Sequence, residues 1–297
     1  MASSKVSVSQ KKSGFKRLEP YLFLAPIILF AVAFVYYPFF KTFLYSFSKV
    51  NVSGEITGFA GFENFAYLFG HRNFKKALFN TLKLTVMFVP LNLCFSMGCA
   101  LLANKKRKLS SVYETMFTLP MAVPMSAVAM IFKILLSPTV GYVNYFLGIN
   151  LGWFEDRKYA MFGILIVCLW MGMAFDFLLF LSALRGLPES VVEAAQLDGA
   201  GFFTRLFKVQ IPLVMPTILY VVCTNLVLAM MTSGPVMIIT EGGPSRSTTT
   251  LIYMMFTSGY QSSDYSLAAC ISIVTFALTF GMTALAFWFD SKRDDYS

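Results

Sequence analysis

The sequence has 297 residues, of which 57% are hydrophobic and 13% charged, and its formal net charge at pH 7 is +9. Soluble domains contain roughly 45 to 50% apolar residues, and the excess here gathers in separate blocks of about 20, the length that crosses a hydrocarbon core. This composition excludes a soluble domain, the lack of alternation within the blocks excludes an outer-membrane barrel, and basic residues gathered beside the blocks indicate membrane topology rather than nucleic-acid binding.

The apolar blocks predict an all-α, polytopic membrane protein with six transmembrane helices. In chain order these are Tyr21–Phe43, Leu78–Ala103, Tyr113–Leu136, Tyr159–Leu184, Pro216–Ile239 and Leu267–Phe289. The first block is longer than the apolar region of a signal peptide, and no A-x-A cleavage site follows it, so we expect it in the mature protein. The predicted organisation is a tail over residues 1–20, a transmembrane domain over 21–289 with a polar loop at 185–215, and a tail over 290–297.

Lysine and arginine predict the orientation, because connections rich in these residues stay in the cytoplasm. If the N-terminus is cytoplasmic, 14 of the 24 basic residues fall in cytoplasmic segments and 8 in extracytoplasmic ones. The other two, Lys83 and Lys133, lie near span ends, where a long side chain can reach the interface. We therefore expect both termini and the 185–215 loop on the cytoplasmic side.

Catalytic motifs are missing from the sequence. It contains no GxxxxGK[ST] loop for ATP, no GxSxG and no HExxH, and its one histidine, His71, lies in a predicted outer loop. The five cysteines sit in or beside apolar blocks without metal-ligand spacing, and we interpret them as small hydrophobic residues. We expect neither an enzyme nor a metal site in this chain.

The loop between the fourth and fifth blocks predicts a helix, a glycine break and a second helix. Pro188 suits the first turn of a helix and Gly199 suits its C-cap. We expect the second helix over Phe202–Val209, with Pro212 ending it. An amphipathic connector resting on lipid headgroups is one interpretation of this loop. Docking to a partner is the other, since the acidic residues of the loop would not improve binding to anionic lipid but could pair with a partner's arginine.

A spacing match in this loop favours the partner. The segment from EAAQLDGAG to VQIP, with nine residues between Gly199 and Val209, resembles the EAA signature of ABC importer permeases, E-A-A-x3-G-x9-I-x-L-P. The signature positions are filled by Glu193, Ala194, Ala195, Gly199, Ile211 and Pro212, with Val209 in place of the usual Ile and Ile211 in place of Leu. Three further segments are similar to the carbohydrate-import branch of this family: LAPIILFAVAFVYYPFFKTFLYSFS, FTLPMAVP and EGGPSRSTTTLIY. The resemblance is closest to the first of the two permeases in the maltose and glycerol-3-phosphate type.

This resemblance covers nearly the whole chain and implies a type I ABC importer permease in the bacterial cytoplasmic (inner) membrane. It implies a second, homologous permease, two ATPase subunits that bind ATP and Mg, an extracytoplasmic solute-binding protein and a sugar-like solute, with no cofactor in this chain. The helix pair 188–209 would then dock on an ATPase subunit. Its implied coupling residues are Glu193 as polar anchor, Ala194 and Ala195 for close approach, Gly199 for the bend, and the accompanying Asp198, Arg205, Ile211 and Pro212.

Candidate pathway residues lie in the third and fourth blocks. Cys168, Gly172 and Asp176 are spaced four apart, with Phe175 beside them, so they share one helix face. Asp176 is the one acid deep in a block, and either contact with solute or a hydrogen bond to a neighbouring helix or to the partner permease explains it. By resemblance, sugar contacts fall on Met121, Met125, Cys168, Gly172 and Phe175, although ordinary helix packing is an equal explanation for the methionines.

Maltose itself is disfavoured, because maltose-type relatives usually have Tyr at position 121 and Asn at position 168. A carboxylate in the pathway also argues against an anionic solute such as glycerol-3-phosphate. The leading hypothesis is thus a sugar or oligosaccharide permease, and the alternative is a permease for a polyol, glycerol-3-phosphate or another small polar solute. A self-sufficient secondary transporter would need inverted repeats and an ion relay in one chain, and a membrane scaffold would leave the EAA segment unexplained.

Overall fold

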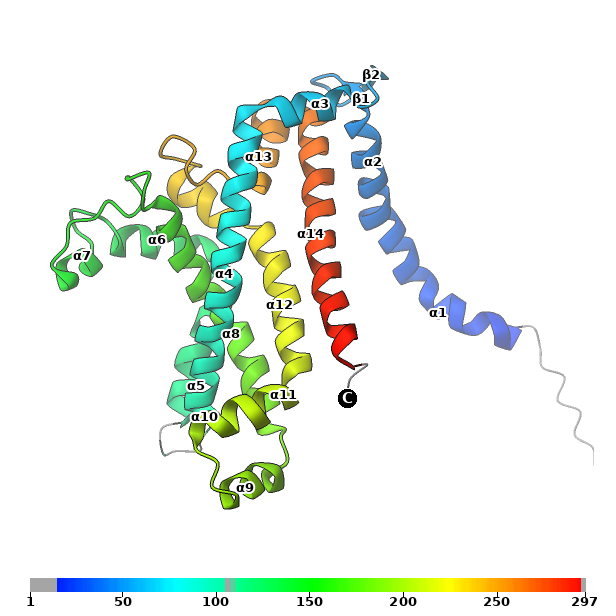
Figure 1. Ribbon diagram of the computed structural model, residues 1–297. Coiled ribbons are helices and arrows are strands. Elements are labelled where there is room, and N and C mark those ends of the chain that lie inside the picture. Colours follow the sequence, from blue (N-terminus) through cyan, green and yellow to red (C-terminus); the bar gives the residue numbers. More distant parts are fainter. Residues whose placement is uncertain (1–14, 105–107, 109, 295–297) are drawn as a thin grey trace, which may run out of the picture.

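The computed structural model describes residues 15–104, 108 and 110–294, and within them the chain is mostly helical (Figure 1). Four helices are long and apolar enough to cross a membrane: Pro20–Ser46, Arg72–Asn104, Ala160–Arg185 and Tyr265–Phe289. Two bent helix pairs pass the same test, so the described residues hold four spans, or six if each bent pair is one span. The outer parts of the predicted tails, 1–14 and 295–297, lie outside the described residues.

The elements follow one another as a series of helices with one short hairpin. The first part runs α1 (Phe15–Ala31), the π-helical η1 (Val32–Tyr36), α2 (Tyr37–Ser46), β1 (Ser48–Val50), β2 (Ile56–Phe59), α3 (Glu63–Gly70), α4 (Arg72–Asn104), α5 (Ser110–Thr118), η2 (Leu119–Ala122), α6 (Met125–Leu135) and α7 (Tyr142–Leu147). The second part runs α8 (Ala160–Arg185), α9 (Glu189–Leu197), α10 (Phe202–Arg205), η3 (Leu206–Gln210), α11 (Ile211–Leu213), α12 (Met215–Met230), η4 (Val236–Thr240), α13 (Leu251–Phe256), η5 (Thr257–Gln261) and α14 (Tyr265–Asp294). β1 and β2 pair antiparallel, with Ser48 opposite Phe59.

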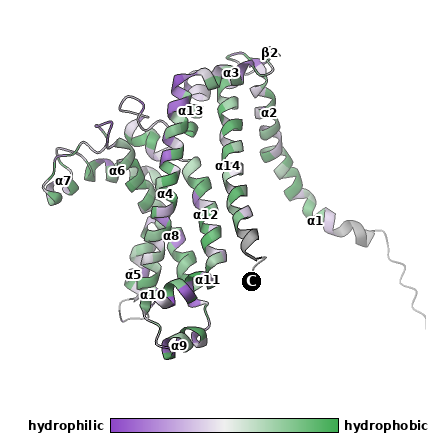
Figure 2. Ribbon diagram, in the orientation of Figure 1, coloured by the Kyte–Doolittle hydropathy of each residue, from purple (hydrophilic) through white to green (hydrophobic). Residues whose placement is uncertain are grey.

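Helices α4, α8 and α12 form the centre of the bundle, and α14 packs against α12, α13 and α2 (Figure 1). Between the central helices lies a buried apolar cluster that includes Met97, Phe177, Phe180 and Val221. Apolar residues cover the helices along most of their length, while polar residues gather toward the two ends of the bundle (Figure 2). This distribution is what a bilayer requires of a bundle that crosses it.

The third predicted span is not one continuous helix. The helix Ser110–Ala122 and the helix Met125–Leu135 meet at an angle of 105°. Val123 between them is extended, with φ −100° and ψ 125°, and Pro124 follows it. The ring of a proline disfavours helical backbone in the preceding residue and removes a backbone donor, so the helix breaks here. The third predicted span, Tyr113–Leu136, is therefore a bent helix pair with its break at Val123 and Pro124.

The fifth predicted span also ends early. It was expected over Pro216–Ile239, but α12 stops at Met230, and η4 begins only at Val236. Met231, Thr232 and Ser233 are not helical, and the helix resumes at Gly234, with Pro235 in its first turn, where the missing backbone donor is tolerated. The non-helical residues between α12 and η4 become part of a cavity wall, described below.

Candidate functional sites: the coupling loop and a mid-membrane cavity

The bend between α9 and α10 requires glycine at position 199. Gly199 has φ +77°, and no heavy atom lies within 4 Å of the position that a Cβ would take, so the requirement comes from the backbone and not from space. Its N–H donates to the carbonyl of Gln196 at 3.0 Å, and the N–H of Ala200 donates to that of Ala195 at 3.0 Å. These bonds close the C-terminus of α9, which confirms the predicted left-handed stop.

The second helix of the loop is longer than expected. Instead of ending before Pro212, the helical run continues through α10, η3 and α11 to Leu213. In η3 the N–H of Ile211 donates to the carbonyl of Leu206, five residues back. Pro212 lies in the first turn of α11, where its missing donor costs nothing. The prediction that Pro212 ends the helix was therefore wrong: the run includes Pro212 and ends at Leu213, and α12 leaves it at 73°.

Helix α9 projects beyond the end of the bundle (Figure 1), and it carries no buried residue. Leu197 is 89% exposed, and Phe203 in α10 is 72% exposed. Glu193, Ala194 and Asp198 are exposed, and neither acid forms an ion pair with any described residue. The other predicted coupling residues are Ala195, Arg205 and Ile211, which are half-buried, and Pro212, which is exposed. The structure thus presents the motif as an outward surface with unpaired acids.

Helix α8 is tied to two neighbours immediately before this loop. The guanidinium of Arg185, its last residue, donates to Glu114 of α5 at 2.5 Å and to the carbonyl of Ala103 of α4 at 3.3 Å. Sequence reasoning missed this pair. Glu114 at the beginning of the third apolar block could have indicated the pair, because an acid within an apolar block needs a charged or hydrogen-bonding partner.

A cavity of about 420 Å³ lies among α4, α6, α8 and the break after α12. We call it the mid-membrane cavity, because Phe88 in its lining is at the middle of α4. Three of the predicted pathway residues, Met125, Cys168 and Gly172, line it together. Met121 and Phe175 do not line it; they are 54% and 42% exposed. The structure thus brings half of the predicted set to one cavity.

One wall of this cavity was missed from the sequence. Met231, Thr232, Ser233, Gly234 and Pro235 form it, and these residues were assigned to the interior of a span. A Cβ at Gly234 would lie 2.1 Å from Cε of Met125, so the absence of a side chain there lets Met125 pack against the break. The Ser-Gly-Pro run was the signal that could have identified this wall.

Asp176 lies between three helices and outside the cavity lining. Its side chain is 1% exposed, and its Oδ2 accepts hydrogen bonds of 2.6 Å from the amides of Asn92 in α4 and Asn225 in α12. The Asn92 amide also lies 3.3 Å from Oδ1 of Asn225. In this arrangement Asp176 has the helix-to-helix hydrogen bonds that were the alternative to solute contact. The objection to an anionic solute, which assumed a carboxylate in the pathway, loses its basis.

Comparison with known proteins gives consistent matches. Residues 92–295 match the family model described as "Binding-protein-dependent transport system inner membrane component". The chain is 32% identical over 282 residues to the sn-glycerol-3-phosphate transport system permease protein UgpA of Pectobacterium atrosepticum, which covers 93% of this chain and 95% of that protein. The protein of the same description from Yersinia enterocolitica is 31% identical over 294 residues, 97% of this chain and 100% of that protein.

Among solved structures, the chain is similar to one from a bacterial ABC transporter involved in the import of the acidic polysaccharide alginate. The TM-score is 0.83 at 20% sequence identity, with 94% of this chain and 98% of that chain covered. A second structure of a bacterial alginate ABC transporter, in complex with its pentasaccharide-bound periplasmic protein, gives a TM-score of 0.80 at 21% identity, with 92% of this chain and 94% of that chain covered. At such identities the likeness concerns the fold, and it confirms the predicted all-α permease fold.

Proposed function

The chain belongs to the family of inner membrane components of binding-protein-dependent transport systems, and on that premise we propose how it works within its importer. It pairs with a second, homologous permease to form the solute pathway. Two separate ATPase subunits bind ATP and Mg beneath it, and an extracytoplasmic binding protein delivers the solute above. The beginning of α1 and the end of α14 lie toward the end of the molecule that carries α9 (Figure 1), in keeping with two cytoplasmic termini.

The observation that carries this proposal is the exposed α9 and its glycine-capped end. Exposed apolar side chains beside unpaired acids are typical of a docking surface for a protein. At an anionic membrane surface the acids would instead weaken binding. Glu193 anchors the loop to a basic group of the ATPase, and exposed Ala194 allows close approach. Since Gly199 closes α9 with backbone hydrogen bonds, the helix moves as a rigid body when the ATPase dimer closes.

The solute passes through the cavity beside Met125, Cys168 and Gly172. Its volume of about 420 Å³ lies within the range of about 300 to 1,000 Å³ that is usual for small-molecule sites. We propose a sugar or oligosaccharide as the solute. A polyol, glycerol-3-phosphate or another small polar solute is the second candidate, favoured by the names of the UgpA relatives.

The coupling proposal is tested in proteoliposomes that contain the whole complex and its binding protein. Glu193→Lys should reverse the anchor's charge and uncouple solute-stimulated ATP hydrolysis from uptake. Glu155→Lys is the matched control, because Glu155 is an exposed acid outside the loop. Wild-type hydrolysis and uptake in Glu193→Lys would contradict the proposal. Uptake by liposomes that contain this chain alone would instead support a self-sufficient transporter.

A further inference from the structure

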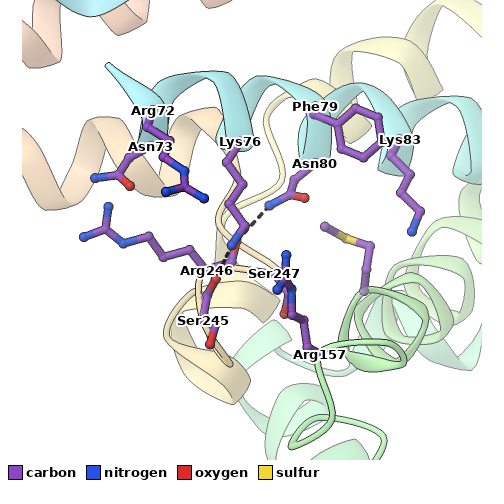
Figure 3. A pocket seen from close by; sticks show the side chains of 11 residues that line it. Arg72, Asn73, Lys76, Phe79, Asn80, Lys83, Arg157, Ser245, Arg246 and Ser247 are labelled. Atoms are coloured by element: carbon purple, nitrogen blue, oxygen red, sulfur yellow. Dashed lines mark hydrogen bonds between the residues drawn. The ribbon is translucent and has the colours of Figure 1, made fainter. Parts of the chain in front are cut away.

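A second cavity, of about 670 Å³, lies at the beginning of α4, and its lining is strongly basic (Figure 3). Five basic side chains line it: Arg72, Lys76 and Lys83 from α4, Arg157 from the segment before α8, and Arg246 from the loop between η4 and α13. No acid is among its lining residues. The opposite end of α4, at Asn104, lies beside the coupling loop, so this basic cavity is on the extracytoplasmic side in the predicted orientation.

The basic cavity is held in shape by hydrogen bonds between α4 and the loop that carries Arg246. The amide of buried Asn80 donates to the carbonyls of Arg246 and Thr249, both at 3.0 Å. The amine of Lys76 donates to the carbonyl of Ser245. These bonds attach the loop to one face of α4, which fixes the position of Arg246 opposite the α4 bases.

Like charges gather here without compensation. None of the five bases forms an ion pair with a described residue, and Lys76 lies within electrostatic reach of Arg157, Arg72 and Arg246. Figure 3 shows the side chains of Arg72, Lys76 and Arg157 directed toward a common space, and the side chain of Arg246 extends to one side of it. An anion that enters this space relieves the mutual repulsion, and guanidinium groups bind carboxylate or phosphate oxygens in pairs.

The basic cavity lies a short distance along α8 and α4 from the mid-membrane cavity. Met161 of α8 lines the first and Cys168 lines the second, and seven residues, or two turns of one helix face, separate them. At 1.5 Å per residue this is a step of about 10 Å. On α4, Lys83 and Phe88 line the two cavities in the same order. A group released at the basic cavity is therefore one short step from the predicted pathway.

We propose that the basic cavity binds the phosphate or carboxylate group of an anionic solute before that solute reaches the mid-membrane cavity. The inference rests on the proposed importer function and narrows its solute to an acidic sugar or a phosphorylated small molecule. A phospholipid headgroup offers the same chemistry, but the position of the basic cavity two helical turns from the mid-membrane cavity favours the solute.

Equilibrium binding to the purified complex in phosphatidylcholine nanodiscs, without binding protein, tests the site. The probes are sn-glycerol-3-phosphate and glucuronate, with glycerol and glucose as their neutral counterparts. At least one anion should bind more tightly than its counterpart, and added salt should weaken it. Arg157→Gln and Arg246→Gln should each lower that affinity on the order of tenfold, while Arg157→Lys should retain more of it. Lys75→Gln is the matched control, since Lys75 is an exposed neighbour on α4 that does not line the cavity.

Four results would overturn the inference. The first would be that neither anion binds more tightly than its neutral counterpart. The second would be that Lys75→Gln weakens anion binding as much as Arg157→Gln does. The third would be that the wild-type complex retains phosphatidylglycerol that the probes cannot displace and that the Arg157→Gln complex loses. The basic cavity would then be a lipid-binding site. The fourth would be that Arg157→Gln weakens the affinity of the complex for its binding protein and leaves probe binding unchanged. The cavity would then be a protein-docking site. ATP hydrolysis distinguishes failure of this inference from failure of the importer function. If the binding protein still stimulates hydrolysis, the importer function stands even when these tests fail.

Discussion

Gly172 of α8 lies directly against Asn92 of α4. A Cβ at position 172 would lie 3.1 Å from Nδ2 and 3.3 Å from Oδ1 of Asn92, and 2.8 Å from Cζ of buried Phe88. The same Asn92 amide donates to Asp176, so the absence of a side chain at position 172 allows the contact that joins α4 to α8.

Gly172→Ala should therefore destabilise the bundle by about 1 to 3 kcal/mol, the usual cost of overpacking a filled site. Thermal unfolding of the detergent-solubilised protein measures this change. Gly98→Ala is the matched control, because nothing lies within 4 Å of a Cβ at position 98 of α4. Alanine there should leave stability equal or higher, since it favours helix more than glycine does. Equal behaviour of the two variants would contradict the close packing described for Gly172.

Asp176→Ala should lower stability more than Asp176→Asn. Alanine leaves the Asn92 and Asn225 amides without their shared acceptor, whereas asparagine keeps an oxygen in place. Each lost hydrogen bond between membrane helices costs about 0.5 to 2 kcal/mol. The check is the midpoint of thermal unfolding, with solute uptake measured in parallel. Because Asp176 does not line the cavity, Asp176→Asn should retain uptake, and an abolished uptake in a stable Asp176→Asn protein would place the residue in the pathway after all.

Gly199→Ala should reduce uptake per ATP hydrolysed. A side chain at φ +77° costs about 1 kcal/mol or more, which favours reopening the end of α9 and softening the coupling loop. Gly201→Ala serves as control, because Gly201 has φ −66° and an unobstructed Cβ position. Coupled proteoliposomes measure both quantities, and a loss of coupling in Gly201→Ala equal to that in Gly199→Ala would show that the left-handed bend is not the cause.

Cys168→Phe should block uptake by filling the mid-membrane cavity while leaving basal ATP hydrolysis in place. The cavity is about 420 Å³, and a phenyl ring beside Gly172 removes a large part of the space between α8 and α6. Cys94→Phe is the control, since Cys94 is exposed on α4 and outside this lining. Normal uptake in Cys168→Phe would show that solute passes elsewhere.

The apolar blocks predicted the unbroken spans well, since α8 (Ala160–Arg185) differs by one residue at each end from the expected Tyr159–Leu184. Length and hydropathy suffice for such a helix. They do not predict the breaks at Val123 and after Met230, which depend on local backbone conformation. A hydrogen bond from Asp176 to a neighbouring helix was one of the predicted alternatives, but its donors could not be identified. Asn92 and Asn225 lie 84 and 49 residues away, and periodicity within one helix says nothing about partners on another.

The basic cavity was missed for a related reason. Its five bases come from three segments, and each had been interpreted through its distance from the nearest span. In the sequence Arg72, Arg157 and Arg246 lie in three separate predicted loops. Only packing of α4 against α8 and the loop before α13 brings them to a common space.

The short segment between Arg185 and α9 limits how far α9 can move relative to α8. Three residues, Gly186, Leu187 and Pro188, separate the end of α8 from the beginning of α9. Fully extended, such a link reaches only about 10 Å, and proline stiffens its last step. Arg185 is also hydrogen-bonded to α4 and α5. Under the proposed coupling, a displacement of α9 is therefore transmitted to three helices with little loss in the connecting segment.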